Sequence, residues 1–377
     1  MAFRRLFFPV LGLAVLAGSA HAGGFSRGTA DTDILFEPGK VDFHAGATLV
    51  VPSQKFTAPP VAAADPALVG TNYLEPYVIP SVAGKISFSD NLACAGTYTH
   101  SNGAASDYAV PYGPGGKLFE EFTVAEYGLT CAIFFDSGPG RFAVLGGAFA
   151  ETFDYELLAG AGLLQLEMDS TAYGWRAGFG YEVPDIALRA QLLYRSGTTH
   201  EPDGSGRLGG IIPLTPNAIG ELPQSVELKV QSGIAPGWLA FGSVKWTDWS
   251  INETLTVNVP ELGQTLQNHY YWRDGWTVTA GIGHSLNERV SGAVSLQWDR
   301  GVSTGYDLRT DKWLLTAGAS VKDVLGGELR LGGGLSYLTS ASIDQATAPD
   351  GAPVPDFGAA VDSGLAGILS ASYSVRW

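Results

Sequence analysis

Few side chains in this sequence combine the residue types and the spacing that chemistry requires. The chain holds six histidines, and those beyond residue 22 are scattered: His44, His100, His200, His269 and His284. None has a partner at the short spacing of metal ligands. His284 directly precedes Ser285, so in a strand the two side chains would point to opposite faces and could not form a nucleophile–base pair. We therefore predict no metal, no cofactor and no enzyme activity.

The chemistry of the two cysteines, Cys94 and Cys131, depends on the compartment. The chain begins MAFRRLFFPVLGLAVLAGSAHA, with a basic pair, an apolar run and small residues, which is the layout of a signal peptide cut after Ala22. A membrane anchor is the alternative, but the apolar run is short for a spanning helix of about 20 residues. In an oxidising compartment we expect a Cys94–Cys131 disulfide rather than two free buried thiols.

The elements that must position these side chains are amphipathic strands. The C-terminal stretch LAGILSASYSVRW places Leu365, Leu369, Tyr373 and Trp377 on one face and mostly small or polar residues on the other. The same alternation recurs in LRAQLLYRSG, SVELKVQSG, VSGAVSLQWDR and ELRLGGGLSYL. Strands in such numbers predict an all-β protein in which the last residue belongs to the fold.

The connections between these strands alternate in length. The tight turns are 89–91, 137–140, 183–185, 235–237, 286–288 and 324–327, and the long links are 57–71, 101–116, 156–170, 197–220, 255–268, 301–308 and 344–360. This alternation is typical of a transmembrane antiparallel β-barrel, and we predict an even number of about fourteen strands. A soluble β-sandwich is the alternative, but aromatic residues end the apolar faces as they do at a membrane interface.

The composition agrees with a barrel whose exterior faces lipid. Charged residues make up only 16% of the chain, against about 25% in a soluble domain. The net charge of −15 argues against nucleic acid as a partner, because nucleic acid requires a basic face.

Residues 23–41 precede the predicted barrel, which we place at 42–377. They hold Gly, Thr, Asp and Pro at strand-breaking spacing, and a short apolar group, Ile34, Leu35 and Phe36. A wide barrel contains either water or a plug, so we predict that this segment enters the lumen as a hatch. A disordered periplasmic tail is the alternative.

Three stretches resemble the FadL/TodX family of outer-membrane transporters for long-chain fatty acids and other hydrophobic compounds. They are YGWRAGFGYEVPDIALRAQLLYRSGTTHEPDG, LPQSVELKVQSGIAPGWLAFGSVKWTDWS and DKWLLTAGASVKDVLGGELRLGGGLSYL, which cover most of the second half of the chain. The resemblance implies a monomeric barrel with an N-terminal hatch in the outer membrane of a Gram-negative bacterium. Family members usually carry Asn-Pro-Ala in the hatch, whereas FEPGK here matches cleanly only at Pro38.

The resemblance also implies a transport route. Substrate would be held in an apolar pocket beside the hatch and released sideways into the membrane at a kinked third strand, which the disulfide would brace. We predict that Ile34, Leu35, Phe36 and Pro38 contact the substrate. A carboxylate head would require a cation in the lumen, and the candidates are Arg189, Arg195 and Lys229. Alternatively, these cations pair with lumen carboxylates such as Glu182, Glu227 or Asp299.

These observations predict passive transport of hydrophobic small molecules such as long-chain fatty acids. The other expected partners are outer-membrane lipid, lipopolysaccharide and the barrel-assembly machinery, which would bind the C-terminal strand. A water-filled porin for polar solutes is the alternative, and an adhesive barrel acting through its loops is a third class. The position of residues 23–41, inside the lumen or outside it, would distinguish these classes.

Overall fold

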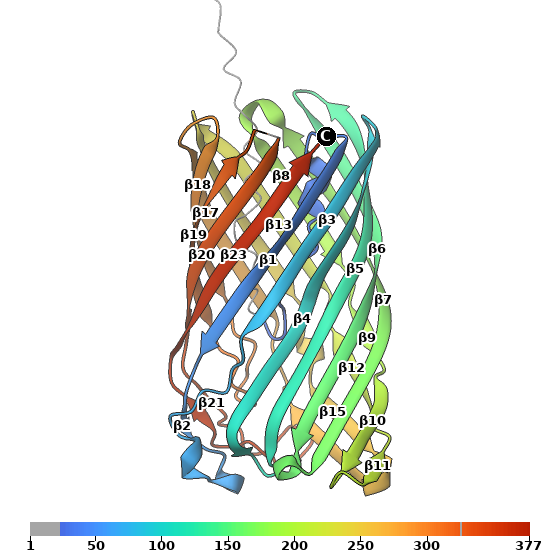
Figure 1. The fold of residues 1–377 in the computed structure, drawn as a ribbon, viewed down its shortest axis with the longest axis vertical. Helices are drawn as coiled ribbons and strands as arrows, with labels where there is room; N and C mark the ends of the chain where they lie inside the picture. Colours follow the sequence, from blue (N-terminus) through green and yellow to red (C-terminus); the bar gives the residue numbers. More distant parts are fainter. Residues whose placement is uncertain (1–22, 325) are drawn as a thin grey trace, which may run out of the picture.

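A closed ring of antiparallel strands forms the protein in the computed structural model, which describes residues 23–324 and 326–377 (Figure 1). Fourteen strands pair in chain order, and the last pairs with the first through the register Leu49↔Leu369. They are β1 (Val41–Ser53), β3 (Tyr77–Ser89), β4 (Leu92–Tyr112), β5 (Lys117–Ser137), β6 (Gly140–Ala159), β7 (Leu164–Val183), β8 (Leu188–Arg195), β13 (Ser225–Ala235), β14 (Trp238–Thr247), β17 (Gly275–Ser285), β18 (Val290–Asp299), β19 (Lys312–Lys322), β20 (Gly327–Leu338) and β23 (Gly364–Arg376). The predicted all-β antiparallel barrel is confirmed.

The helices that are described are short. They are 3₁₀ turns: η1 (Thr32–Phe36), η2 (Val61–Ala63), η3 (Pro66–Leu68), η4 (Gly160–Gly162), η5 (Pro184–Ile186), η6 (Trp249–Ile251) and η7 (Pro260–Leu262). No helix in the described part of the chain is long and apolar enough to cross a membrane. The predicted signal peptide, residues 1–22, lies outside the described residues.

The strands alternate between an apolar outer face and a lumen face. In β23, Leu365 and Leu369 are 57% and 65% exposed on the outside, whereas Ala366 and Ile368 are 3% and 6% exposed because they point into the barrel. Trp377 follows β23, and its backbone exchanges hydrogen bonds with Val41. The final residue is therefore part of the closed ring, as predicted.

The two ends of the barrel differ in their connections. At one end, here called the turn end, tight turns join the strands and the C-terminus lies beside the start of β1 (Figure 1). At the other end, the loop end, the chain adds β9 (Thr198–His200), β10 (Asp203–Leu208), β11 (Ile212–Leu214), β12 (Asn217–Leu222), β15 (Thr254–Val259) and β16 (Gln264–His269) to the sheet. A separate small sheet there contains β2 (Phe56–Ala58), β21 (Ala341–Ser342) and β22 (Ala360–Val361). In barrels of this kind the turn end faces the periplasm.

The predicted links 101–116 and 156–170 are wrong, because both are mostly strand. β4 continues to Tyr112 and β5 begins at Lys117, so residues 113–116 alone connect them. Likewise, β6 extends to Ala159 and β7 begins at Leu164. These strands therefore rise beyond the lipid-facing part of the wall, and they build one side of the loop end.

The predicted disulfide between Cys94 and Cys131 is present. The two residues lie directly opposite each other on β4 and β5, close to the turn end. Their neighbours Ala93, Ala95 and Ala132 are buried on the lumen face, so the two sulfurs lie on the outer face of the wall. The bridge joins the third barrel strand to the fourth.

Candidate functional site

The N-terminal segment, residues 23–40, makes contacts with strands from opposite sides of the ring. Asp31 Oδ2 lies 2.8 Å from Nδ1 of His44 on β1, and Asp33 Oδ2 lies 3.2 Å from Nζ of Lys229 on β13. Thr32 accepts a hydrogen bond of 3.3 Å from Gln191 on β8. Because β1 and β13 are distant in the order of the ring, these contacts place the segment inside the barrel.

Nearby positive groups stabilise the ionised form of the Asp31 carboxyl. Burial alone would raise the pKa of its carboxyl, but the hydrogen bond and charge of His44, together with the charge of Lys229, hold that pKa below its usual value. The lowered pKa keeps the Asp31 carboxyl ionised, so it remains attracted to the nearby Lys229.

Apolar contacts anchor the segment near the turn end. Ile34, Leu35 and Phe36 of η1 are 0%, 1% and 6% exposed. They pack in a cluster with lumen-facing residues of β3 to β6, namely Ala83, Ala93, Ala95, Ala132, Phe134, Ala143 and Leu145. The strand residues are mostly alanine, and small side chains leave the space that η1 fills.

A second anchor lies toward the loop end. The ring of Phe25 is 4.8 Å from the rings of both Phe122 and Trp272, and it also contacts Trp249 and Tyr270. The edge-to-face geometry of Phe25 with Phe122 is one that aromatic pairs prefer. Residues 25–36 are thus held at both ends by apolar packing.

Between these anchors, the segment pairs with the edge of β4. The β3–β4 ladder ends at Ser81↔Thr99 although both strands continue. Beyond that point Arg27 N donates to Ser101 O at 2.9 Å and Gly28 N donates to His100 O at 2.8 Å, while Ser26 forms a bridge with Asn102. The ladder of β4 with β5 has a bulge at the same place, between His100 and Asn102. The third barrel strand is therefore irregular here, and the N-terminal segment satisfies its free edge.

Glycines permit this close approach. A Cβ atom on Gly28 would lie 2.5 Å from the hydroxyl of Thr99, and one on Gly103 would lie 2.6 Å from the guanidinium carbon of Arg27. Both distances are shorter than packed atoms adopt, so the backbone of the segment reaches β4 because side chains are missing at these two positions.

A cavity of about 550 Å³ lies between the segment and the loop end. Aromatic and aliphatic side chains supply much of its wall, including Phe122, Phe153, Tyr155 and Leu157 from β5 and β6. Phe25 and Arg27 of the N-terminal segment line it, together with Tyr77 at the start of β3. The cavity therefore reaches the place where the β3–β4 ladder is interrupted.

A smaller cavity of about 210 Å³ lies on the other side of the segment. Its wall includes polar residues such as Asp31, His44, Gln191, Lys229 and Ser372. The lumen thus holds a large, mostly apolar chamber and a smaller, more polar one, and residues of the N-terminal segment line both.

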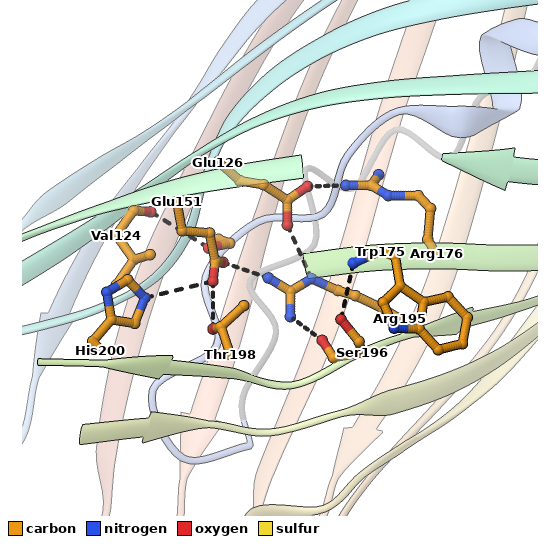
Figure 2. Close-up of polar contacts among 10 residues, drawn as sticks. Val124, Glu126, Glu151, Trp175, Arg176, Arg195, Ser196, Thr198 and His200 are labelled. Atoms are coloured by element: carbon orange, nitrogen blue, oxygen red, sulfur yellow. Dashed lines mark hydrogen bonds and ion pairs between the residues drawn. The ribbon is translucent and has the colours of Figure 1, made fainter. Parts of the chain in front are cut away.

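Buried ion pairs connect side chains of β5, β6, β7 and β8 (Figure 2). Arg195 on β8 lies between two carboxylates: its Nε is 2.9 Å from Glu126 of β5, and its Nη2 bonds Glu151 of β6. Arg176 on β7 also bonds Glu126. The guanidiniums of Arg176 and Arg195 both lie over the ring of Phe149. The two arginines balance the charges of the two glutamates, and these ion pairs cross-link the strands that carry them.

Hydroxyl groups complete the coordination of Glu151, which is fully buried. Thr198 of β9 donates to Oε2 at 2.7 Å, and Ser101 of β4 donates to Oε1 at 2.9 Å. His200 Nε2 lies 3.7 Å from Oε2 (Figure 2). The backbone oxygen of Ser101 also accepts a hydrogen bond from the backbone N–H of Arg27. The ion-pair network and the N-terminal segment therefore meet at β4.

The structure places the predicted cations away from the large cavity. Arg195 belongs to the ion-pair network, and Lys229 pairs with Asp33 and, at 3.9 Å, with Glu227, which is the alternative that the sequence left open. Arg189 contacts Gln231 and lies 5.5 Å from the ring of Phe36. Arg189 and Lys229 line the small polar cavity.

The hatch residues that were predicted to contact the substrate also lie away from the large cavity. Ile34, Leu35 and Phe36 are buried in the alanine-rich cluster rather than lining the large cavity, and Pro38 is exposed. Their contact with a substrate stays a prediction. The residues of the large cavity that sequence reasoning missed are Phe25, Arg27, Arg309 and the tyrosines. The aromatic residues in and just after the long links, such as Tyr73, Tyr108 and Tyr270, are the signal that could have found the cavity.

Comparison with known proteins agrees with this architecture. A family model described as "Outer membrane protein transport protein (OMPP1/FadL/TodX)" matches residues 144–299. No curated protein sequence matches the chain. The solved structure of a Pseudomonas aeruginosa FadL homologue superposes with a TM-score of 0.72 at 13% identity, covering 89% of this chain and 90% of the other.

Toluene transporters have the same fold. Pseudomonas putida TodX matches with a TM-score of 0.61 at 12% identity, over 96% of this chain and 97% of its own. Ralstonia pickettii TbuX matches with a TM-score of 0.59 at 15% identity, over 91% and 90%. These structures show that the chain shares the barrel fold of outer-membrane transport proteins. Over residues 144–299 the chain is thus similar to a family of outer-membrane transport proteins, in agreement with the resemblance found in its sequence.

Proposed function

We propose that this protein passively transports hydrophobic small molecules, such as long-chain fatty acids, from the cell exterior into the outer membrane. The observation that carries the proposal is the position of the 550 Å³ cavity: it extends from the loop end to residues 24–27, where the β3–β4 ladder is interrupted. The toluene transport named for TodX and TbuX fits an aromatic-lined chamber of this kind.

The N-terminal segment acts as the plug in this proposal. Its two apolar anchors and its ion pairs to β1 and β13 occupy the lumen between the two cavities. Apolar contact stabilises a bound ligand by about 0.8 kcal/mol per buried methylene, so a long chain would bind tightly. Release therefore requires an exit with comparable apolar contact, which lipid provides and water does not.

Lateral release would occur between β3 and β4. Residues 100–103 of β4 pair with the N-terminal segment instead of β3, and contact with the chain before β3 resumes where Glu75 N donates to Ala105 O. A movement of residues 25–28 away from β4 would open this part of the wall toward the lipid. The Cys94–Cys131 bridge lies between this region and the turn end and would keep β4 in register during the movement.

A porin for polar solutes is the second candidate, because the smaller cavity is the more polar of the two. Serine, glutamine and charged side chains line it on β1, β8, β13 and β23. In a porin, water and ions would pass continuously through this chamber, and the N-terminal segment would leave a path beside it.

A reversible lock on the segment tests the transport proposal. Ser26 and Asn102 form a cross-strand bridge, and opposed residues of this kind have Cβ atoms within about 5.5 Å. Ser26→Cys with Asn102→Cys, made in a Cys94→Ser/Cys131→Ser background, should form one disulfide. We expect oxidised protein in liposomes to lose uptake of a fluorescent fatty acid, and reductant to restore it.

The single variant Ser26→Cys in the same background is the matched control and should transport under both conditions. Unchanged uptake by the oxidised, cross-linked double variant would contradict the role of the segment as a moving plug.

A further inference from the structure

Tyr271 has a backbone conformation that bulky residues rarely adopt. It lies in the connection between β16 and β17, and its φ of 42° falls in the left-handed region. The other described non-glycine residues with a positive φ are the much smaller Ala161 and Ala187. A strained conformation persists only when its surroundings hold it, so the contacts of Tyr271 indicate what the strain serves.

Hydrogen bonds and an aromatic contact hold Tyr271 in this conformation. Its N–H donates to the backbone oxygen of Glu253 at 3.0 Å, and its own backbone oxygen accepts from the hydroxyl of Thr304 at 2.6 Å. Its ring centre lies 5.1 Å from that of Tyr306. Thr304 and Tyr306 both belong to the connection between β18 and β19. That connection therefore supports the strained backbone.

The two neighbours of this tyrosine hold the start of the N-terminal segment. The ring centres of Tyr270 and Trp272 lie 5.7 Å and 4.8 Å from that of Phe25. The backbone oxygen of Phe25 in turn accepts a hydrogen bond of 2.8 Å from the N–H of Gly103 on β4. Residues 270–272, here called the clamp, therefore fix the segment at the place where it pairs with β4.

The β18–β19 connection also contacts the small sheet at the loop end. The backbone oxygen of Gly305 accepts a hydrogen bond of 3.0 Å from the N–H of Asp344, which follows β21 closely. Tyr306 packs against the apolar cluster that includes residues of β2, β21 and β22. A continuous chain of contacts thus runs from the small sheet, through this connection, to the clamp.

The strain at Tyr271 works against the closed clamp. In the left-handed region the Cβ atom lies too close to the following carbonyl oxygen, so a bulky residue gains free energy when φ returns to negative values. That rotation would change the relative directions of Tyr270 and Trp272, and the two rings would no longer fit together against Phe25. Loss of the support from the β18–β19 connection would therefore open the clamp.

We infer that Tyr271 is a strained latch, through which the small sheet at the loop end controls the release of the N-terminal segment from β4. The inference rests on the proposed function, in which residues 25–28 leave β4, and it adds the element that triggers this step. Displacement of Tyr306 from outside removes the support of Tyr271, and the clamp then opens. Tyr271 acts through Phe25, so it is a positioning residue.

The rate of thiol labelling at position 102 tests this inference, because the segment pairs with Asn102, which is 7% exposed. Asn102→Cys, made in the Cys94→Ser/Cys131→Ser background, would react with a water-soluble maleimide only when the segment leaves β4. Tyr271→Ala and Tyr271→Gly both remove the ring, but only glycine adopts a positive φ freely. We expect Tyr271→Ala to label at least about fivefold faster than Tyr271→Gly.

Tyr306→Ala tests the connection to the loop end. It should speed labelling about fivefold in protein that retains Tyr271, and it should have little effect together with Tyr271→Gly, because glycine needs no support there. Ala187→Gly relieves the same backbone conformation at the turn end, where φ is 51°. It is the matched control and should leave the labelling rate unchanged.

Equal labelling of Tyr271→Ala and Tyr271→Gly, or an equal effect of Tyr306→Ala in both backgrounds, would overturn the latch. Labelling of every variant as fast as in unfolded protein, or of none, would instead contradict the segment as a moving plug and with it the proposed function.

Discussion

Individual charged residues in the lumen differ in whether they have a partner of opposite charge. A residue with such a partner is assigned a structural role, and one without is a candidate for ligand binding. Arg195 has two carboxylates within bonding distance, whereas Arg27 has none among the described residues. Sequence alone ranked Arg195 as a ligand candidate and missed Arg27, because both are single arginines in polar surroundings. Only the register of β5 to β8 brings Glu126 and Glu151 to Arg195.

Arg195→Met should therefore destabilise the barrel without acting through the substrate. The change leaves Glu151 fully buried and Glu126 with one cation fewer, and breaking a buried pair costs about 3–5 kcal/mol. Urea unfolding of protein reconstituted in lipid vesicles would measure the loss. Arg207→Met, at an exposed position of β10, should change the free energy of unfolding little. Equal stability of the two variants would contradict a structural role for the network.

At the level of elements, the sequence predicted strands well where their outer faces meet lipid. Leu365, Leu369 and Tyr373 alternate with buried small residues, so the period of two is clear. Residues 101–116 and 156–170 were expected to be loops because glycines interrupt both stretches, although Leu164, Leu166 and Met168 alternate with polar residues in the second. Beyond the membrane the outer face of β4 to β7 needs no apolar side chains, and backbone pairing with the neighbouring strand is sufficient to keep them extended.

The disulfide should stabilise the β4–β5 pair. It spans 37 residues, for which chain entropy predicts about 4 kcal/mol of stabilisation. Cys94→Ala with Cys131→Ala should lower the free energy of unfolding in urea by roughly this amount or less. Reductant should produce the same decrease in the wild type and no change in the double variant. An unchanged wild type after verified reduction would show that the ladder alone sets the stability of this wall.

For the whole molecule, the sequence supplied the closed barrel, the outer-membrane class and the disulfide, but not the shape of the lumen. Alternation along each strand specifies which residues point inward, and the tight turns specify which strands are neighbours. The path of residues 23–40 across the lumen depends on contacts with strands far away in sequence, such as Lys229 with Asp33 and Arg376 with Glu37. No local pattern specifies those contacts, and so the cavity lined by Phe25 and Arg27 could not be derived from the sequence.

The central claim is that residues 23–40 close the lumen of a barrel that carries hydrophobic molecules. Single-channel conductance in planar bilayers tests it most directly, with the mature chain compared with a variant that lacks residues 23–40 and begins at β1. Our account predicts a closed wild type and steady ion conductance after the deletion, because residues of the segment lie between the two cavities and line both. Steady conductance of the wild type would contradict the plug and favour the porin.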